Sequence, residues 1–465
     1  MSADNRSAAM IIGISNTGET VCAASARIST QQGNALEILE KSTDNRNNSK
    51  LVSKVLKSGH SSVIEHTYFN LAFSNVSVMV EQFMIEFRLA SFTVKSRRYV
   101  DFSSVGYVTP ELPQELWTNA YQTAYAEHMD CLFSAYENLL SHGVPKEDAR
   151  FVLPYCYRSN FYCSANAREF MHILRAMLYG RGKKYPEIFN LGKNLLIQAK
   201  ELCPGIFENF ENTGANYDDT VSLDFINLPQ EKEAPQEKVE LLQAPANAAK
   251  IAAKTVLITQ TQLSSRQIDE LLQDKSKVSE IIRRLIKNSR PRELETLNYT
   301  FRFNGISLAG VTHVVRHRLQ SVCVPSLKYT DRTNHVIPAT ISSSPDLLEC
   351  YQTAFRKNLE IYQALQKQGV PEEMLVYFCL SGNTLDLVTT MNARELLLFL
   401  RLRTCMRAQW EVRGYALEML RKLREVSPEI FNDYGASCYL EGKCPEGALT
   451  CGKFAEMQEF FKTML

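Results

Sequence analysis

Residues 65–101 read "EHTYFNLAFSNVSVMVEQFMIEFRLASFTVKSRRYVD" and align without a gap on residues 295–331, "ETLNYTFRFNGISLAGVTHVVRHRLQSVCVPSLKYTD". Ten of the 37 aligned positions are identical. Two shorter blocks repeat at nearly the same spacing: "NARE" at 166–169 and 392–395, and "PGIFENF" from Pro204 with "PEIFNDY" from Pro428. Similarity at an almost constant spacing indicates an internal repeat. The chain is therefore predicted to be a tandem duplication.

The predicted halves are residues 1–211 and 246–465. Residues 212–245 between them are polar, contain proline and have no hydrophobic period, which is typical of a linker. Within each half an aromatic-rich stretch, at 66–73 and at 297–303, predicts a strand. Apolar residues three and four apart then predict a helix that ends near a charged triplet. The predicted fold class is α+β.

Residues 392–426 are predicted as one long helical stretch, because apolar residues recur at helical spacing. The apolar positions are Leu396, Leu400, Met406 and Trp410.

Composition describes a globular chain of 465 residues with 45% apolar content and a net charge of +1. That charge predicts neither a nucleic-acid partner nor an anionic membrane surface, so the expected ligand is a small molecule. The N-terminal residues lack a basic region followed by a long apolar core, which favours a cytoplasmic location. Cys438, Cys444 and Cys451 fit either three ligands of a zinc ion or free thiols, and no metal is predicted.

Arg316, His317 and Arg318 crowd together after an apolar run. Adjacent arginines repel one another unless an anion lies between them, and their guanidinium groups suit phosphate oxygens. The alternative is a solvated helix end with cations near its C-terminus.

The triplet, followed after seven residues by Ser326, resembles the signature of the flavin-dependent thymidylate synthases. Segments "SGHSSVIEH" at 58–66, "EDARFVLP" at 147–154 and "NARELLLFLRLRTCMRAQWEVR" at 392–413 resemble further family motifs, in the family's order. The resemblance implies two copies of that fold, in which an antiparallel sheet packs with long helices.

The resemblance also implies a reaction, in which methylenetetrahydrofolate gives a methylene group to C5 of dUMP and FAD, reduced by NADPH, supplies the hydride. Family members are homotetramers, so a duplicated chain is expected to form a homodimer that resembles a tetramer. Cofactor contacts are expected from Arg316, His317, Arg318, Asn392, Arg394, Asn166, Arg168, His172, His60 and Glu65. Substrate contacts are expected from Ser96, Arg98, Arg150, His313, Arg316 and Arg403, with Arg403 also catalytic.

The two halves depart from the family pattern in opposite ways. The first half has Glu86 at the position of Arg316 and Met177 at that of Arg403, whereas the second half has Val376 at the position of Arg150. The losses are complementary. One composite site is therefore predicted, with Arg98 and Arg150 from a first half and Arg316 and Arg403 from a second half.

Two alternatives stay open. Val94 and Val324 stand where the family has an acidic residue, which favours a flavin- or folate-dependent methyltransferase acting on another pyrimidine nucleotide. Glu86 and Phe87 favour a nucleotide-binding homologue that has lost catalysis.

Overall fold

The computed structural model describes residues 6–43, 45–110, 119–214, 216–227, 233 and 235–464. The chain divides into two compact units. Unit 1 consists of Met1–Gln230 with Ile337–Gly382, and unit 2 of Glu231–Val336 with Asn383–Leu465. Unit 1 thus contains a segment of the predicted second half.

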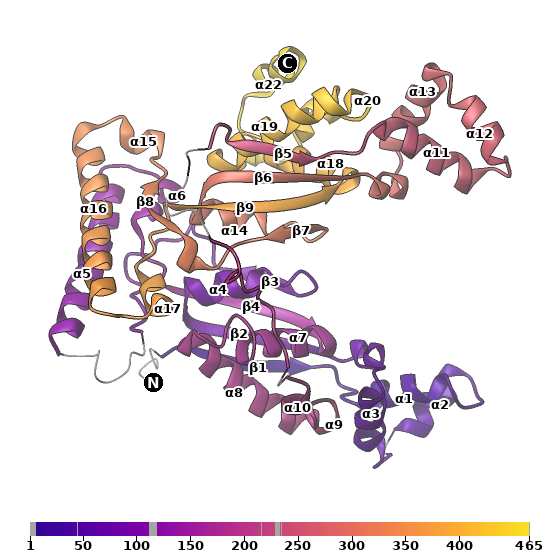
Figure 1. Ribbon diagram of the computed structural model, residues 1–465, viewed down its shortest axis with the longest axis horizontal. Coiled ribbons are helices and arrows are strands. Elements are labelled where there is room, and N and C mark those ends of the chain that lie inside the picture. Colours follow the sequence, from indigo (N-terminus) through magenta and orange to yellow (C-terminus); the bar gives the residue numbers. More distant parts are fainter. Residues whose placement is uncertain are drawn as a thin grey trace. The chain divides into compact units, whose positions relative to one another are not determined.

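Each unit is built around one antiparallel sheet (Figure 1). The sheet of unit 1 has the order β1-β2-β4-β3, and that of unit 2 the order β5-β6-β9-β7, with β8 also paired to β9. The strands are β1 (Ala8–Ile14), β2 (Tyr68–Ser77), β3 (Ser91–Val94), β4 (Arg158–Asn166), β5 (Val239–Gln243), β6 (Asn298–Ser307), β7 (Gln320–Cys323), β8 (Asp331–His335) and β9 (Asn383–Asn392). The two predicted strands correspond to β2 and β6.

Helices of both units pack against these sheets, which confirms the predicted α+β class. Unit 1 contains α1 (Thr20–Ile28), α2 (Ala35–Ser42), α3 (Asn48–Lys57), η1 (Ser61–His66), α4 (Val78–Ile85), α5 (Asn119–Ser141), α6 (Lys146–Ala149), η2 (Arg150–Val152), α7 (Ala167–Leu178), α8 (Pro186–Leu202), α9 (Pro204–Phe207), α10 (Phe210–Gly214), α15 (Ala339–Ser342), α16 (Pro345–Lys367), α17 (Glu372–Leu375) and η5 (Val376–Phe378). Unit 2 contains α11 (Ala248–Gln260), α12 (Ser265–Leu271), α13 (Lys275–Ile286), η3 (Arg292–Thr296), α14 (Leu308–Val314), η4 (Leu327–Tyr329), α18 (Ala393–Arg403), α19 (Trp410–Val426), α20 (Pro428–Phe431), α21 (Ser437–Glu441), η6 (Gly447–Leu449) and α22 (Phe454–Thr463). Elements labelled η are 3₁₀ helices.

The strand-to-helix turn is the same in both units. Ser77 caps α4 and Ser307 caps α14, each through its hydroxyl. A buried glutamate accepts the backbone N–H of the capping serine, Glu187 at 2.9 Å in unit 1 and Glu411 at 2.7 Å in unit 2. The two serines occupy equivalent positions in the repeat, and so do the two glutamates that accept their N–H groups. This shared arrangement supports the duplication predicted from the sequence.

Within unit 1, the segment Ile337–Gly382 packs against its own counterpart from the first half. Helices α5 and α16 lie side by side (Figure 1). Tyr155 N donates to Cys379 O at 2.7 Å, and Ser381 N donates to Leu153 O at 2.9 Å. These two bonds are equivalent under the repeat, so the contact is self-complementary, as at a two-fold interface. At this interface the two halves of one chain therefore pair with each other.

The predicted long helix over 392–426 is in fact two helices, α18 and α19, so that prediction was wrong in its continuity. The break occurs because Gln409 caps α19, accepting the N–H of Val412 at 2.8 Å, while Arg413 Nε donates to Thr404 O at 3.1 Å. Leu396 and Leu400 are fully buried as expected. Met406 and Trp410 lie at the break and are 37% and 39% exposed.

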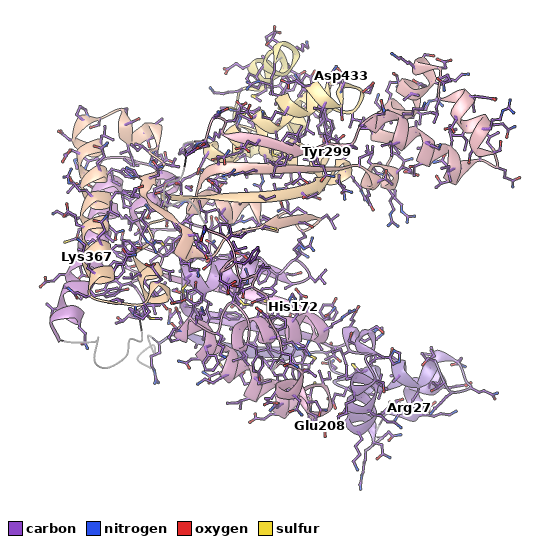
Figure 2. The ribbon with its side chains drawn as sticks, in the orientation of Figure 1. Arg27, His172, Glu208, Tyr299, Lys367 and Asp433 are labelled. Carbon is purple, nitrogen blue, oxygen red and sulfur yellow. The ribbon has the colours of Figure 1, made fainter. Side chains whose placement is uncertain are left out.

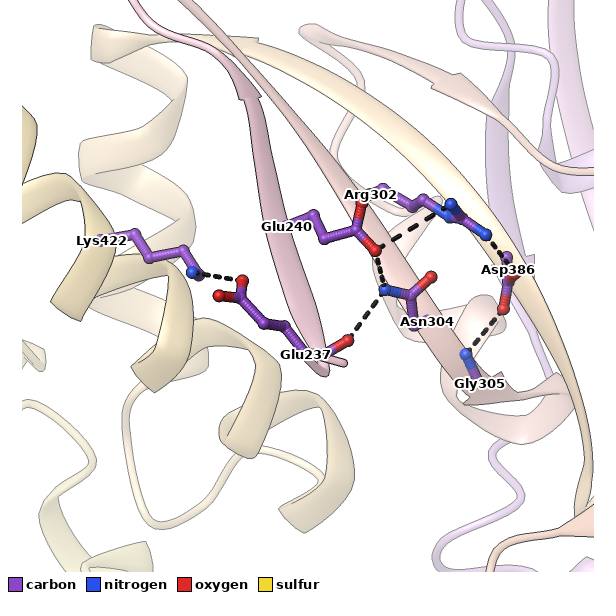
Figure 3. A network of polar contacts seen from close by, with 7 residues as sticks. All are labelled: Glu237, Glu240, Arg302, Asn304, Gly305, Asp386 and Lys422. Carbon is purple, nitrogen blue, oxygen red and sulfur yellow. Dashed lines mark hydrogen bonds and ion pairs between the residues drawn. The ribbon is translucent and has the colours of Figure 1, made fainter. Parts of the chain in front are cut away.

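A charged network joins β5, β6 and β9 in unit 2 (Figure 3). Arg302 Nη2 donates to Asp386 Oδ2 at 2.9 Å, and the other carboxylate oxygen of Asp386 accepts Gly305 N at 2.9 Å. Gly305 has φ +68°, a left-handed conformation at the bulge of β6 that suits glycine. The first half has Ala72 at the position of Arg302, so the two sheets carry different surface charges.

Among the described residues, no helix combines the length and the apolarity that a membrane span requires.

Candidate functional site

His317 lies just beyond the end of α14 and is 6% exposed. Its Nδ1 is 2.9 Å from Oε1 of Glu395, a buried residue in the first turn of α18. Its ring meets Phe399 edge-on, with centroids 4.8 Å apart. The histidine is therefore fixed in the interior of unit 2 by one carboxylate and one aromatic ring.

Arg403, at the end of α18, is held by two of the predicted site residues. Its Nε donates to Nε2 of His317 at 3.0 Å, and its Nη2 donates to the carbonyl oxygen of His313 at 3.2 Å. Arginine has no acceptor, so Nε2 of His317 is unprotonated and Nδ1 carries the proton toward Glu395. Burial lowers the pKa of His317 below 6.5, and Arg403 adds to that effect, so the ring is neutral near pH 7.

Arg316 and Arg318 flank His317 and are both exposed. Asn392 caps α18, because its side chain accepts the N–H of Glu395 at 2.9 Å. Arg394 donates to Oε1 of Glu295 at 2.5 Å. The structure therefore places Asn392 and Arg394 at the start of α18 and Arg403 at its end.

In unit 1 the counterpart of this triplet has a different environment. Glu86 pairs with Arg181 at 2.5 Å, so its charge is neutralised within the unit. Phe87, at the position of His317, meets the ring of His172 edge-on at 5.3 Å. Met177, at the position of Arg403, is fully buried. The first half therefore lacks both the histidine and the helix-end arginine of the second.

The polar segment after the first half lies on the same part of unit 1. The ring of Tyr217 is 6.5 Å from that of His172, and Asp219 lies so close to Gly180 that a Cβ there would come within 2.5 Å of its carboxylate. Asp219 also acts electrostatically on Arg181. Residues predicted only as a linker thus cover the surface around the degenerate triplet.

The predicted substrate residues of the first half gather around Glu147 in unit 1. Arg98 Nε donates to its carboxylate at 2.6 Å, and Arg150 Nε donates to its carbonyl oxygen at 3.0 Å. Ser96 accepts the N–H of Arg98 at 3.3 Å. Arg150 is 3% exposed, and its pKa is lowered mainly by burial and also by the positive charges of Arg97 and Arg98. The positive charges of Arg97 and Arg98 therefore act on the buried guanidinium of Arg150.

A second group of predicted residues lines a cavity of about 380 Å³ in unit 1. His172, labelled in Figure 2, contributes from α7, and Gly59 and Ser61 flank His60, which is exposed. Arg168 lines the same cavity and donates to Glu65 at 2.5 Å. Asn166 caps α7 through Glu169 N at 2.9 Å. Lys57, Arg175, Met171 and Ile206 also line the cavity, which combines cations with an apolar floor.

Sequence reasoning missed several residues that organise these groups. Glu395 and Glu147 each hold predicted residues in place, and Arg181 neutralises Glu86. The repeated "NARE" block contains Glu395, and Arg181 aligns with Arg407 at the same spacing of 226 residues, so both carried a signal in the repeat. Glu147 carried a signal too, because it opens the segment at 147–154 and aligns with Glu373 at the same spacing of 226 residues.

Cys438 lies in α21, with Cys444 and Cys451 in the following loop, and all three are free thiols. Burial raises the pKa of Cys438, and nearby Cys405, Cys444 and Cys451 contribute. In the described part of the chain, no set of three or more histidine, cysteine, aspartate or glutamate side chains is arranged to hold a metal ion.

The two sheets and the repeated strand-to-helix turn define a duplicated α+β protein. Residues 11–205 and 239–429 match the model of the family described as Thymidylate synthase complementing protein. The chain belongs to this family, which confirms the resemblance read from its motifs.

Curated relatives agree with this assignment. A flavin-dependent thymidylate synthase from Geobacter sulfurreducens is 36% identical over 236 residues, which cover 49% of this chain and 99% of the relative. Another, from Clostridium tetani, is 30% identical over 244 residues, covering 48% of this chain and 96% of the relative. About half of this chain therefore aligns with almost the full length of each relative.

Among solved structures, a UMP/dUMP methylase from Streptomyces cacaoi bound with 5-Br dUMP covers 45% of this chain and 96% of its own, with 22% identity and a TM-score of 0.38.

Proposed function

We propose that the protein is a flavin-dependent thymidylate synthase, which methylates dUMP to dTMP with methylenetetrahydrofolate, FAD and NADPH at a composite site between unlike halves. Family membership and the relatives' names support the reaction class. The composite arrangement rests on a structural observation of its own. The residues that replace the two cations do not lie on the surface, because Met177 and Val376 are both fully buried.

That observation carries the proposal because neither half contains a cation at the position where its arginine has been replaced. A buried methionine cannot take over the role of Arg403, and a buried valine cannot take over that of Arg150. Each half keeps the cations that the other lacks, so a nucleotide that needs both sets requires one first half and one second half.

For the nucleotide, Ser96, Arg98 and Arg150 are proposed to hold the phosphate of dUMP. Arg150 is buried, and the positive charges of Arg97 and Arg98 act on it, so a dianionic phosphate would stabilise its charged form. Each charge-assisted hydrogen bond of this kind contributes about 1.5–3 kcal/mol.

Arg403 is proposed to face the uracil ring, where its positive charge stabilises negative charge that develops as C5 becomes nucleophilic. His317 and the carbonyl of His313 fix two of its N–H groups, so the guanidinium is oriented before substrate arrives. Preorganisation of this kind lowers the reorganisation needed in the transition state.

The residues around the triplet fit an FAD pyrophosphate. Arg316 and Arg318 are exposed cations on either side of a buried neutral histidine, so their charge is directed outward. When bound, FAD supplies the hydride. Arg316 and Arg318 would bind the phosphates, while His317 acts through Arg403. The basic cavity of unit 1, lined by Arg168 and His172, suits an anionic ligand with a flat apolar part, such as the folate or the flavin. His60 is exposed next to the lining residues Gly59 and Ser61.

Protein incubated with FAD, NADPH and methylenetetrahydrofolate should release tritium from C5-labelled dUMP and form dTMP. Release from labelled UMP in place of dUMP would favour the methyltransferase on another pyrimidine nucleotide. A purified protein that binds flavin and releases no tritium from either nucleotide would refute the proposed reaction.

We also propose a homodimer of the whole chain. The self-complementary contact within unit 1 supports this proposal, because it resembles a two-fold interface between two copies of one subunit. Sedimentation equilibrium should therefore give twice the mass of 52.8 kDa.

A further inference from the structure

Arg97, between Ser96 and Arg98, forms an ion pair with Glu81 of α4 in the interior of unit 1. The two side chains are 7% and 2% exposed. The guanidinium also lies over the ring of Tyr157, with its Cζ 5.7 Å from the ring centroid. No sequence motif singled out this pair.

The pair is a costly feature that the fold does not need. Among the described residues, Nε of Arg97 is buried and finds no hydrogen-bond partner, and an unused buried donor destabilises a folded protein. The second half has Val311 and Leu327 at the two positions, and both are part of an ordered unit with the same strand-to-helix turn. Apolar residues of similar size commonly replace buried ion pairs without loss of stability.

The position of Arg97 suggests what the pair contributes. Ser96 precedes it and Arg98 follows it, so anchoring its side chain fixes the backbone that carries both proposed phosphate contacts. Its charge also acts on Arg150 from inside the protein. The half that keeps this pair is the half that keeps Arg98 and Arg150, whereas the other half has lost the pair together with the arginine at position 376.

We propose that Arg97 and Glu81 are positioning residues, which hold Ser96, Arg98 and Arg150 in the arrangement that binds the nucleotide phosphate. This inference rests on the proposed function. It predicts that nucleotide affinity depends on the ion pair, whereas protein stability is largely kept when both members are replaced together.

The test compares Arg97→Leu with the double variant Glu81→Val, Arg97→Leu, which reproduces the residues of the second half. Arg97→Leu removes the cation that pairs with the buried Glu81 carboxylate and leaves it the hydroxyl of Ser159 as a donor, so the melting temperature should fall. The double variant should recover most of that loss. Its Kd and KM for dUMP should nevertheless rise by about tenfold or more, because small displacements of positioned groups are expensive, while flavin absorbance and kcat stay close to the wild type.

Arg302→Ala is the matched control, since it removes an ion-paired arginine from the other unit and reproduces Ala72 of the first half. It should leave the Kd for dUMP unchanged. Arg97→Lys, which keeps the charge without the planar guanidinium, provides a second variant that retains a partner for Glu81. It should weaken dUMP binding by roughly threefold to tenfold at nearly wild-type stability.

A folded double variant with the wild-type Kd for dUMP would overturn the inference and leave the proposed function standing. If the double variant does not fold, an unchanged Kd in Arg97→Lys overturns it equally. Wild-type protein that binds no dUMP would overturn the proposed function itself, and the inference with it.

Discussion

Replacing His317 by phenylalanine tests whether this histidine orients Arg403 or only fills space. Phenylalanine is the residue that the first half carries at this position, where Phe87 is 5% exposed and packs well. The substitution removes two polar contacts at once: the acceptor for Arg403 Nε at 3.0 Å and the donor to Glu395 at 2.9 Å. The ring contact with Phe399 can be retained.

The two losses have different sizes and different readouts. Glu395 is 3% exposed, and leaving its carboxylate without a donor should cost about 1–3 kcal/mol of folding free energy. For a unit of this size, that corresponds to a fall of roughly 2–12 °C in melting temperature, measured by differential scanning fluorimetry. Releasing the guanidinium of Arg403 should lower kcat/KM by about 100-fold in the tritium-release assay.

A second substitution separates the two effects. In unit 1, His172 Nδ1 lies 3.4 Å from Glu169, the counterpart of Glu395. The variant His317→Phe, Leu398→His copies that arrangement, because Leu398 aligns with His172. It should recover stability without recovering activity. If activity returns together with stability, or if His317→Phe alone keeps wild-type kcat/KM, the orienting role of His317 is refuted.

Three further predictions concern the same site. Arg316→Ala should lose flavin, seen as lost absorbance in the flavin bands, whereas Arg88→Ala should keep it, and equal losses would contradict a single type of flavin site. Because the folded-state pKa of His317 lies below 6.5, the unfolded chain takes up a proton first as the pH falls. The melting temperature should therefore fall below about pH 6.5, and less so in His317→Phe. Asn392→Ala should cost about 0.5–2 kcal/mol by removing the cap of α18, whereas Asn392→Ser should restore stability, and a flavin loss in both would add a cofactor contact to the capping role.

Much of the fold could be predicted because the repeat shows most of the strands and helices twice in the sequence, although, among the described residues, β8 has no counterpart in the sheet of unit 1. Strands β2 and β6 share their pattern, and the positions of Ser77 and Ser307 mark the same helix start in both halves. The break between α18 and α19 was missed because apolar spacing continues through it. A new helix, α19, begins after Gln409, whose side chain caps its first turn. Glutamine is not among the residues that usually mark a helix N-cap in a sequence.

The segment Ile337–Gly382 could not be assigned to unit 1 from the sequence, since its partners lie more than two hundred residues away in the chain. Its pairing depends on long-range contacts such as that of His128 Nε2 with Asn358 Oδ1 at 2.9 Å. Neither residue belongs to a motif. A repeat shows that two copies exist, but it does not specify which unit each segment joins.

In the candidate site, residue type and spacing identified the charged groups. The residues that orient these groups through hydrogen bonds were not predicted. Arg403 and His317 stand out because arginine and histidine suit anions and flavins. Glu395, which fixes the tautomer of His317, appeared only as one letter of a repeated block. Buried carboxylates that orient other side chains leave little trace in a single sequence, because glutamate in the first turn of a helix is common for reasons of capping and dipole alone.

The asymmetry between the halves follows from the energetics of buried charge. An arginine held in the interior for a ligand costs stability, and replacement by a well-packed apolar residue recovers it. Once a chain contains two copies, each copy can lose the arginine whose function the other copy still supplies. Met177 and Val376 are both fully buried, as expected for residues that replaced an arginine in this way. The first half retains the buried ion pair of Arg97 and Glu81 and therefore still contains a buried charged group. Under the proposed composite site, selection for nucleotide binding would act once per pair of halves and preserve one set of cations in each.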